Sequence, residues 1–199
     1  MPNNRRDRWL TIPNAICVFR FLGSFAIVPA VIAERPLVVL SLFVFLAMTD
    51  WVDGKLARAL DQRSLIGPKL DSVADVTMYA MFLFAVSWLR ADVLRSESSW
   101  VIVAAVCFVI AIAAARIKFG SFPSYHTRSA KTTWFLMVIA AIALFLNWSV
   151  WPLRIALLGV IVTNLESIAI TATLTQPQTD VISLAAARRL EKKSQDSSV

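Results

Sequence analysis

Long apolar runs, separated by short polar connections, make up most of this sequence. A helix needs about 20 residues to cross the hydrocarbon core of a bilayer, and most of these runs approach or exceed that length. The pattern predicts an all-α integral membrane protein with six transmembrane helices. The predicted spans are residues 12–33, 37–60, 69–89 and 100–115, a fifth that follows residue 131 and ends near residue 148, and 151–174.

The second apolar run is shorter than the others and is followed directly by acidic residues. It covers only residues 37–48, which is too short to cross a bilayer. We therefore expect its helix to continue through Asp50 to about residue 60. The acidic residues would then lie on the cytoplasmic half of the helix, where a water-filled cavity can accommodate charge.

The composition agrees with a membrane location. Of the 199 residues, 58% are hydrophobic and the mean hydropathy is +0.67, which is more apolar surface than a soluble domain of this size can bury. We expect an interfacial amino-terminal segment (1–11), a six-helix transmembrane catalytic domain (12–174) and a polar cytoplasmic tail (175–199) with a short basic surface helix. Cys17 and Cys107 lie inside apolar runs and are expected to be buried free thiols.

The positive charges fall mainly on one side of the predicted spans. The net charge is +7, and fifteen of the twenty Lys and Arg residues precede the first span or lie in the second-to-third connection, the fourth-to-fifth connection and the tail. Because cytoplasmic loops are enriched in Lys and Arg, both termini are predicted to be cytoplasmic in a multi-pass cell (inner) membrane protein. These charges are expected to face anionic headgroups of the lipid bilayer, and no nucleic-acid partner is expected.

Four aspartates flank the second-to-third connection. Asp50 and Asp53 are three residues apart, and Asp71 and Asp75 are four apart, so each pair lies on one face of its own helix. A turn between the helices would bring the two faces together, where four carboxylates repel unless cations lie between them. Oxygen ligands of this kind suit Mg²⁺ or Mn²⁺, and we expect two ions.

The residues around these aspartates carry a resemblance to a known family. Residues 50–75 match every defining position of Asp-x2-Asp-Gly-x2-Ala-Arg-x8-Gly-x3-Asp-x3-Asp. This stretch resembles the signature of the CDP-alcohol phosphatidyltransferase family, in which phosphatidylglycerophosphate synthases are found. The resemblance implies an enzyme of phospholipid synthesis that moves a phosphatidyl group from CDP-diacylglycerol to an alcohol by direct displacement and releases CMP.

The resemblance also implies roles for individual residues. Asp50, Asp53, Asp71 and Asp75 would bind the metal ions, and Asp75 would be the general base; whether Asp75 moves the proton or only binds metal stays open. The nucleotide and diphosphate pocket would be lined by Gly54, Ala57, Arg58 and Gly67. Family members resemble homodimers, so a homodimer is a further expectation.

The acceptor alcohol is inferred from the basic fourth-to-fifth connection. A phosphorylated acceptor needs cations away from the metals, and the candidates are Arg116, Lys118, Arg128 and Lys131. Glycerol 3-phosphate is the first choice, with inositol phosphate or phosphatidylglycerol, which would give cardiolipin, as alternatives. The competing interpretation is that these four are ordinary charges of a cytoplasmic loop.

Three polar residues inside the predicted spans have open interpretations. Arg20 either extends to the membrane interface or takes part in the active site, while Asn164 and Glu166 either contact substrate or bond between helices. A divalent-cation transporter would also explain intramembrane aspartates. The transporter interpretation gives no role to Gly54, Ala57, Arg58 or Gly67. It also favours acidic groups nearer the middle of the bilayer.

Overall fold

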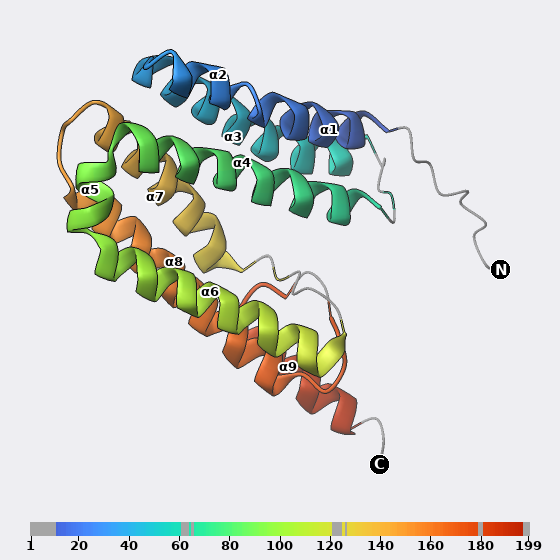
Figure 1. The fold of residues 1–199 in the computed structure, drawn as a ribbon. Coiled ribbons are helices and arrows are strands. Elements are labelled where there is room, and N and C mark those ends of the chain that lie inside the picture. The colour runs from blue at the N-terminus through green and yellow to red at the C-terminus, as the bar shows by residue number, and fades with distance from the viewer. Residues whose placement is uncertain are drawn as a thin grey trace. The chain divides into compact units, whose positions relative to one another are not determined.

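The computed structural model describes residues 11–60, 64, 66–120, 125, 127–178 and 181–196. Within these ranges, the structure describes the backbone but not the side chains of a few residues, which are 51, 53–55, 57, 58, 68 and 194–196. Every regular element among the described residues is a helix (Figure 1). The chain divides into two compact units, Met1–Leu94 and Arg95–Val199, each of which is described separately here.

The first unit is built around a helix that carries its polar side chains inward. Helix α1 (Ile12–Ser24) begins where Thr11 accepts a hydrogen bond from the backbone N–H of Asn14 at 3.2 Å, with a proline in its first turn. Its buried residues are Pro13, Asn14, Cys17, Arg20 and Ser24. Because they recur every three or four positions, they form one stripe. That stripe is the polar face of an otherwise apolar helix, as expected when lipid surrounds the protein.

Helix α1 packs against both α3 (Pro36–Ala59) and α4 (Gly67–Leu89). The short helix α2 (Ile27–Ile32) follows α1 and also contacts α3 and α4. The core between these helices includes Phe43 of α3, whose ring stacks on Phe82 of α4 with centroids 3.9 Å apart. The cyan α3 and green α4 of Figure 1 thus hold their apolar halves together, which fixes the polar ends next to them.

The second unit is organised around α8 (Trp151–Thr173). Helices α6 (Ser98–Phe119) and α7 (Arg128–Phe145) both pack against α8, and so does α9 (Leu184–Asp196). Helix α5 (Ala91–Ser96) lies at the boundary between the units. Gly120, with a φ of +67°, ends α6 in the left-handed conformation that glycine adopts at little cost.

Five helical segments in the described part of the chain are long and apolar enough to cross a membrane. They are Ile12–Ile32, Lys69–Leu89, Ser98–Phe119, Arg128–Phe145 and Trp151–Thr173. The all-helical membrane class is therefore confirmed. The predicted second span corresponds to one continuous helix, α3, but only its Pro36–Asp50 portion is apolar. Six spans with two cytoplasmic termini remain a prediction.

Helix boundaries agree with the sequence interpretation to within a few residues for most elements. Two features differ. The first predicted span is interrupted at residues 25–26, between α1 and α2, and the short helix α5 was not predicted. The predicted surface helix of the tail corresponds to α9. The proposed amino-terminal segment lies almost entirely outside the described residues.

Candidate active site

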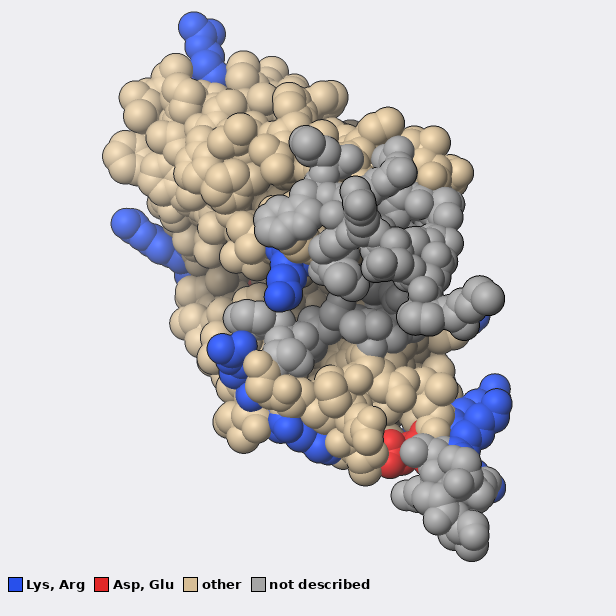
Figure 2. Space-filling model, turned by 90° about the vertical axis from the view of Figure 1, so that its right-hand side faces the viewer, with Lys and Arg blue, Asp and Glu red and all other residues tan. Residues whose placement is uncertain are grey.

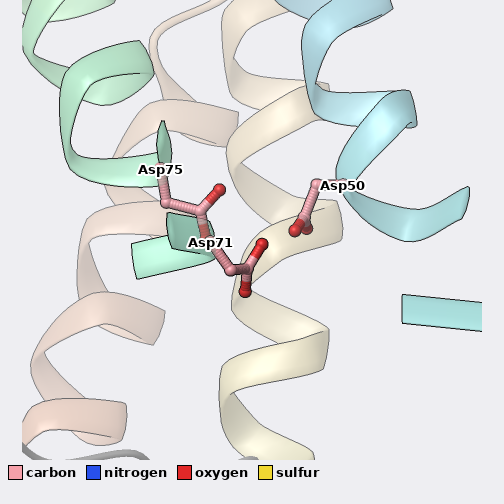
Figure 3. Close-up of side chains that lie close together, drawn as sticks. All are labelled: Asp50, Asp71 and Asp75. Atoms are coloured by element: carbon pink, nitrogen blue, oxygen red, sulfur yellow. The ribbon is translucent and has the colours of Figure 1, made fainter. Parts of the chain in front are cut away.

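Three of the four predicted metal ligands come together in the first unit. Asp50 lies on α3, and Asp71 and Asp75 lie on α4. One carboxylate oxygen from each is within 4.8 Å of the others. In Figure 3 the three carboxylates point into a common space between the two helices. Each side chain is between 24 and 32% exposed. The three are neither solvated surface acids nor sealed from solvent.

The packing of the helices explains this arrangement. Asp50 continues the buried stripe of Phe43, Leu46 and Ala47 on α3, at the three- and four-residue spacing of one helix face. Asp71 and Asp75 share the face of Ala74 and Met78 on α4. These stripes pack together, so the acidic positions that extend them also converge.

Arg20 of α1 lies among the three carboxylates. Its Nη1 is 2.7 Å from Oδ1 of Asp50 and 3.4 Å from Oδ1 of Asp75, while Nη2 is 2.5 Å from Oδ1 of Asp71. Its side chain is 0% exposed. A buried guanidinium is costly unless it is paired, and here three carboxylates offset that cost. Arg20 does not extend to the interface: it belongs to the aspartate cluster.

The cluster is joined by a thiol. The buried Sγ of Cys17 lies 3.7 Å from Nη2 of Arg20 and 3.9 Å from Oδ1 of Asp71. Both cysteines of the chain are free, as predicted, although Cys107 is only partly buried. Cys17 is one helical turn before Arg20, so the polar stripe of α1 supplies both side chains.

Gly67 occupies a tight contact at the start of α4. Its N–H donates to Oγ of Ser64 at 2.8 Å, and the same hydroxyl lies 3.1 Å from Nδ2 of Asn14. A Cβ on residue 67 would lie only 3.1 Å from the Ser64 oxygen and 3.2 Å from Oδ1 of Asn14. The glycine therefore allows α1, the connection and α4 to approach closely. Its predicted place in a nucleotide pocket stays a prediction.

The remaining signature residues lie on the last turns of α3. Asp53, Gly54, Ala57 and Arg58 are helical in their backbone, but their side chains lie outside the described part of the structure. Helical geometry alone puts residues 50, 53, 54 and 57 on one face of α3. Their predicted roles in binding metal, nucleotide and diphosphate remain predictions.

The four basic acceptor candidates belong to the second unit and differ in their contacts. Lys118 donates from Nζ to the carbonyls of Thr171 and Ala172, both at 2.9 Å, and so binds the carboxyl end of α8. Arg116 donates from Nη1 to the carbonyl of Gly120 at 3.1 Å. Arg128 and Lys131 are exposed on the first turn of α7. Where side chains are coloured in Figure 2, basic ones predominate over acidic ones.

Glu166 connects three elements of the second unit. One of its carboxylate oxygens accepts a hydrogen bond from the hydroxyl of Ser129 on α7, and the other accepts from the backbone N–H of Leu184 at the start of α9, at 3.2 Å. Asn164 donates to the carbonyl of Val160 within α8 at 2.8 Å. Of the two interpretations of Glu166, bonding between helices is the one that these contacts support.

The donor set suits a hard cation. Three carboxylates from two helices offer oxygen atoms only, which is the ligand chemistry of Mg²⁺ or Mn²⁺. The cluster could therefore hold a metal ion, with Asp53 as the fourth candidate ligand from the sequence. Arg20 already supplies one positive charge at this place.

Known proteins resemble this chain over parts of its length. A glycerol-3-phosphate 3-phosphatidyltransferase that uses CDP-diacylglycerol, from Yersinia enterocolitica, is 42% identical over 79 residues, covering 40% of this chain and 42% of the relative. A Sodalis glossinidius protein of the same name is 38% identical over 79 residues, again 40% of this chain and 42% of the relative.

A relative with a different acceptor in its name also matches. The CDP-diacylglycerol–serine O-phosphatidyltransferase of Mycobacterium bovis is 30% identical over 118 residues, covering 56% of this chain and 40% of the relative. The chain thus spans less than half the length of each of these relatives. No solved structure matches it.

The match to a family model is much longer. The model described as CDP-alcohol phosphatidyltransferase matches residues 10–189, which include the whole aspartate cluster, Arg20 and all eight signature positions. The resemblance noted in the signature therefore extends over nearly the entire sequence, and the chain belongs to the CDP-alcohol phosphatidyltransferase family.

Proposed function

We propose that this protein transfers a phosphatidyl group from CDP-diacylglycerol to glycerol 3-phosphate and releases CMP. The observation that carries this proposal is the convergence of Asp50, Asp71 and Asp75 within a chain of this family. A cytidine diphosphate lipid carries adjacent phosphates. Its reaction therefore needs cations at the phosphoryl oxygens and a carboxylate near the attacking hydroxyl.

The aspartates would hold the metal ions of this reaction. Asp50, Asp71 and Asp75, together with Asp53, would bind Mg²⁺ or Mn²⁺, and two ions suit four carboxylates. When bound, such ions neutralise the phosphoryl oxygens and stabilise the charge that develops on them. Arg58, with Gly54, Ala57 and Gly67, would contact the diphosphate and the nucleotide.

Asp75 is the proposed proton acceptor. The acceptor oxygen forms a bond to the phosphorus of the phosphatidyl group, and the bond from that phosphorus to the oxygen of CMP breaks. The hydroxyl proton passes to the carboxylate of Asp75. Of the three distances from Arg20, the one to Asp75 is the longest, at 3.4 Å, compared with 2.5 and 2.7 Å. A longer contact with the guanidinium stabilises the charged carboxylate less, which supports Asp75 as the proton acceptor.

Arg128 and Lys131 are the proposed contacts of the acceptor phosphate. They are exposed and three residues apart on α7, so they can act on one ligand. Arg116 and Lys118 remain candidates, but both already donate to backbone carbonyls. The similarity to the Yersinia protein supports glycerol 3-phosphate. Inositol phosphate and phosphatidylglycerol remain alternative acceptors.

Serine is a second candidate acceptor because of the similarity to the Mycobacterium bovis protein. Serine carries no phosphate, so it would not need the exposed cations of α7. Transfer to serine that is insensitive to changes at Arg128 would favour this candidate over glycerol 3-phosphate.

The proposal includes a membrane arrangement. Six spans with both termini in the cytoplasm would place the aspartates on the cytoplasmic side of the cell membrane, where CDP-diacylglycerol in the bilayer and a small phosphorylated alcohol in solution can meet. A homodimer is part of the proposal through the family resemblance alone. The domain division remains 1–11, 12–174 and 175–199.

The test is CMP release by the purified protein in detergent, with CDP-diacylglycerol and either Mg²⁺ or Mn²⁺. Glycerol 3-phosphate, inositol phosphate, phosphatidylglycerol and serine are supplied one at a time. Release with glycerol 3-phosphate that is lost on chelation supports the proposal, and release with another acceptor alone corrects the substrate. If no acceptor supports release and the protein binds metal without any effect of CDP, the transporter interpretation is favoured instead.

A further inference from the structure

We propose that Arg20 is the internal counter-cation of the aspartate cluster. In the metal-free protein its guanidinium supplies the positive charge that keeps Asp50, Asp71 and Asp75 together, and its presence weakens metal binding to the same carboxylates. This inference rests on the metal site proposed above. It concerns a positioning residue, since Arg20 acts through the aspartates.

The geometry suits this task. The two terminal nitrogens of Arg20 serve three carboxylates from two helices: Nη1 lies near Asp50 and Asp75, and Nη2 lies 2.5 Å from Asp71. A forked, planar guanidinium can serve separate acceptors in this way, whereas the single nitrogen of lysine cannot bridge the same positions as well. Arg20 therefore joins α1 to both α3 and α4 through charge.

The charge balance gives the reason for a cation here. Three carboxylates with oxygens within 4.8 Å of one another repel strongly in a partly buried place, where water screens charges weakly. The guanidinium of Arg20 contacts all three of these anions. One guanidinium charge lowers the repulsion among three carboxylates without neutralising it, so a divalent cation can stabilise the cluster further.

Arg20 and a metal ion then act on the same charges. Each stabilises the cluster less when the other is already present, because part of the repulsion has been removed. This is negative coupling between an internal cation and a bound one. Removing Arg20 should make the metal-free fold unstable and make metal binding tighter.

A purely structural ion pair predicts something different. Such a pair stabilises the fold by a similar amount whether or not metal is present. The pair between Arg154 and Glu97 in the second unit provides the matched control, because Arg154 also donates to a buried carboxylate, through two hydrogen bonds of 2.8 Å, and that carboxylate belongs to Glu97 and not to the aspartate cluster. Arg20→Gln and Arg154→Gln each replace a positively charged arginine by a neutral glutamine, one in the aspartate cluster and one in the pair with Glu97.

The experiment measures thermal unfolding of the purified full-length protein in detergent, in EDTA and across a titration of MnCl₂, without substrate. In EDTA we expect both variants to unfold at lower temperature than the wild type. Mn²⁺ should raise the unfolding temperature of Arg20→Gln more than that of the wild type, and Arg154→Gln should show the wild-type increase. Mn²⁺ binding followed by electron paramagnetic resonance should be tighter in Arg20→Gln by about fivefold or more.

Two results would overturn the proposal. One is an Arg20→Gln protein whose loss of stability is equal in EDTA and in Mn²⁺. The other is Mn²⁺ binding in Arg20→Gln that is unchanged or weaker than in the wild type. If Arg20→Gln cannot be purified in EDTA, preparation in Mn²⁺ throughout should recover folded protein, and failure in both conditions counts against the proposal. Arg20→Lys, which keeps the charge but not the forked geometry, should give a metal response between those of the wild type and Arg20→Gln.

These measurements are independent of the proposed reaction. Tighter Mn²⁺ binding in Arg20→Gln, from a wild-type protein that releases no CMP, would leave the counter-cation in place and reject the transferase assignment. Metal-dependent CMP release together with an unchanged metal affinity in Arg20→Gln would support the transferase assignment and reject the counter-cation role of Arg20. A wild-type protein that binds no Mn²⁺ would reject the metal site and the counter-cation together.

Discussion

Arg154 donates two hydrogen bonds to the carboxylate of Glu97, from Nε to Oε2 and from Nη2 to Oε1, each 2.8 Å long. Glu97 immediately precedes α6 and Arg154 lies in the first turn of α8, so the pair ties the beginnings of these two helices. The guanidinium of Arg154 also lies over the ring of Trp151, 5.2 Å from its centroid. Bidentate geometry of this kind makes an ion pair more specific than a single contact.

The stability of the second unit should therefore depend on pH through Glu97. Hydrogen bonds from Arg154 hold the pKa of Glu97 below its usual value of 4.5. A carboxylate whose pKa is lowered by folding stabilises the protein above its unfolded pKa, and this contribution is lost as the pH falls through the folded pKa. Glu97→Gln should be less stable than the wild type at neutral pH, and the difference should shrink below pH 4.5. Thermal unfolding of both proteins in detergent between pH 3 and pH 8 measures this, and a difference that stays constant over the range would contradict it.

Asp71→Asn should abolish phosphatidyl transfer while the protein still folds. The change removes one charge from the cluster and weakens the contact with Nη2 of Arg20. We expect CMP release to fall by a factor of about 100 or more, the magnitude seen when an electrostatic contribution to the transition state is lost. Asp92→Asn is the matched control, because it makes the same substitution at an aspartate of α5 whose side chain is 73% exposed. Oδ1 of Asp92 lies 3.7 Å from Nε of Arg90. Turnover by Asp71→Asn at the wild-type level would reject the metal-site model.

Gly67→Ala should destabilise the junction of α1 and α4. The added Cβ would meet the Ser64 and Asn14 side chains at 3.1 and 3.2 Å, so both must shift. Overpacking of this kind costs about 1–3 kcal/mol. Adding Ser64→Ala removes one of the two close contacts, so the double variant should be more stable than the sum of the single effects predicts. Strict additivity in chemical or thermal unfolding would show that the two positions do not interact.

Arg128→Ala should raise the KM for the acceptor much more than the KM for CDP-diacylglycerol. The expected increase is about tenfold or more for a charged contact to phosphate, with a smaller change in kcat. Arg188→Ala is a suitable control because Arg188 is also an exposed arginine, but on α9. Equal effects on both KM values would show that Arg128 does not bind the acceptor and would favour its interpretation as an ordinary charge of a cytoplasmic loop.

Lys118→Met should instead affect stability. The ammonium of Lys118 binds two carbonyls near the carboxyl end of α8, where a positive charge is favourable. Its removal leaves those carbonyls without this donor, and we expect a loss of about 1–2 kcal/mol in the free energy of unfolding. Kinetic constants of the folded variant should change little. A large increase in acceptor KM without loss of stability would restore Lys118 as a binding residue.

The sequence predicted the fold class and three members of the aspartate cluster for physical reasons. Apolar runs near the length of a bilayer crossing specify membrane helices almost directly. The three- and four-residue spacing of Asp50, Asp53, Asp71 and Asp75 predicted that each pair lies on one face of its own helix, and a turn between the helices was expected to bring the two faces together. For Asp50, Asp71 and Asp75 the structure brings those faces together.

The role of Arg20 could not be decided from its position in the span alone. The signal that would have favoured the interior was the stripe it shares with Asn14, Cys17 and Ser24, since polar and small residues on one face of a membrane helix mark its packed side. The partners themselves depend on how α1 packs against α3 and α4. The contacts of Lys118 could not be predicted from the sequence either. Its carbonyl partners are more than fifty residues away, so the residue resembles an ordinary charge of a cytoplasmic loop.

The carboxyl-terminal tail is anchored in the second unit. Val181 and Ala187 are fully or almost fully buried and pack with Ile170 and Leu174 of the end of α8. Helix α9 also reaches back, through the N–H of Leu184, to Glu166. A protein shortened before residue 181 would leave an apolar patch at the end of α8 and would remove one of the two hydrogen-bond donors of Glu166, because the contact with Ser129 remains. Affinity tags and fusion partners for this protein therefore belong after α9, and loss of expression on trimming the tail would reflect a damaged core.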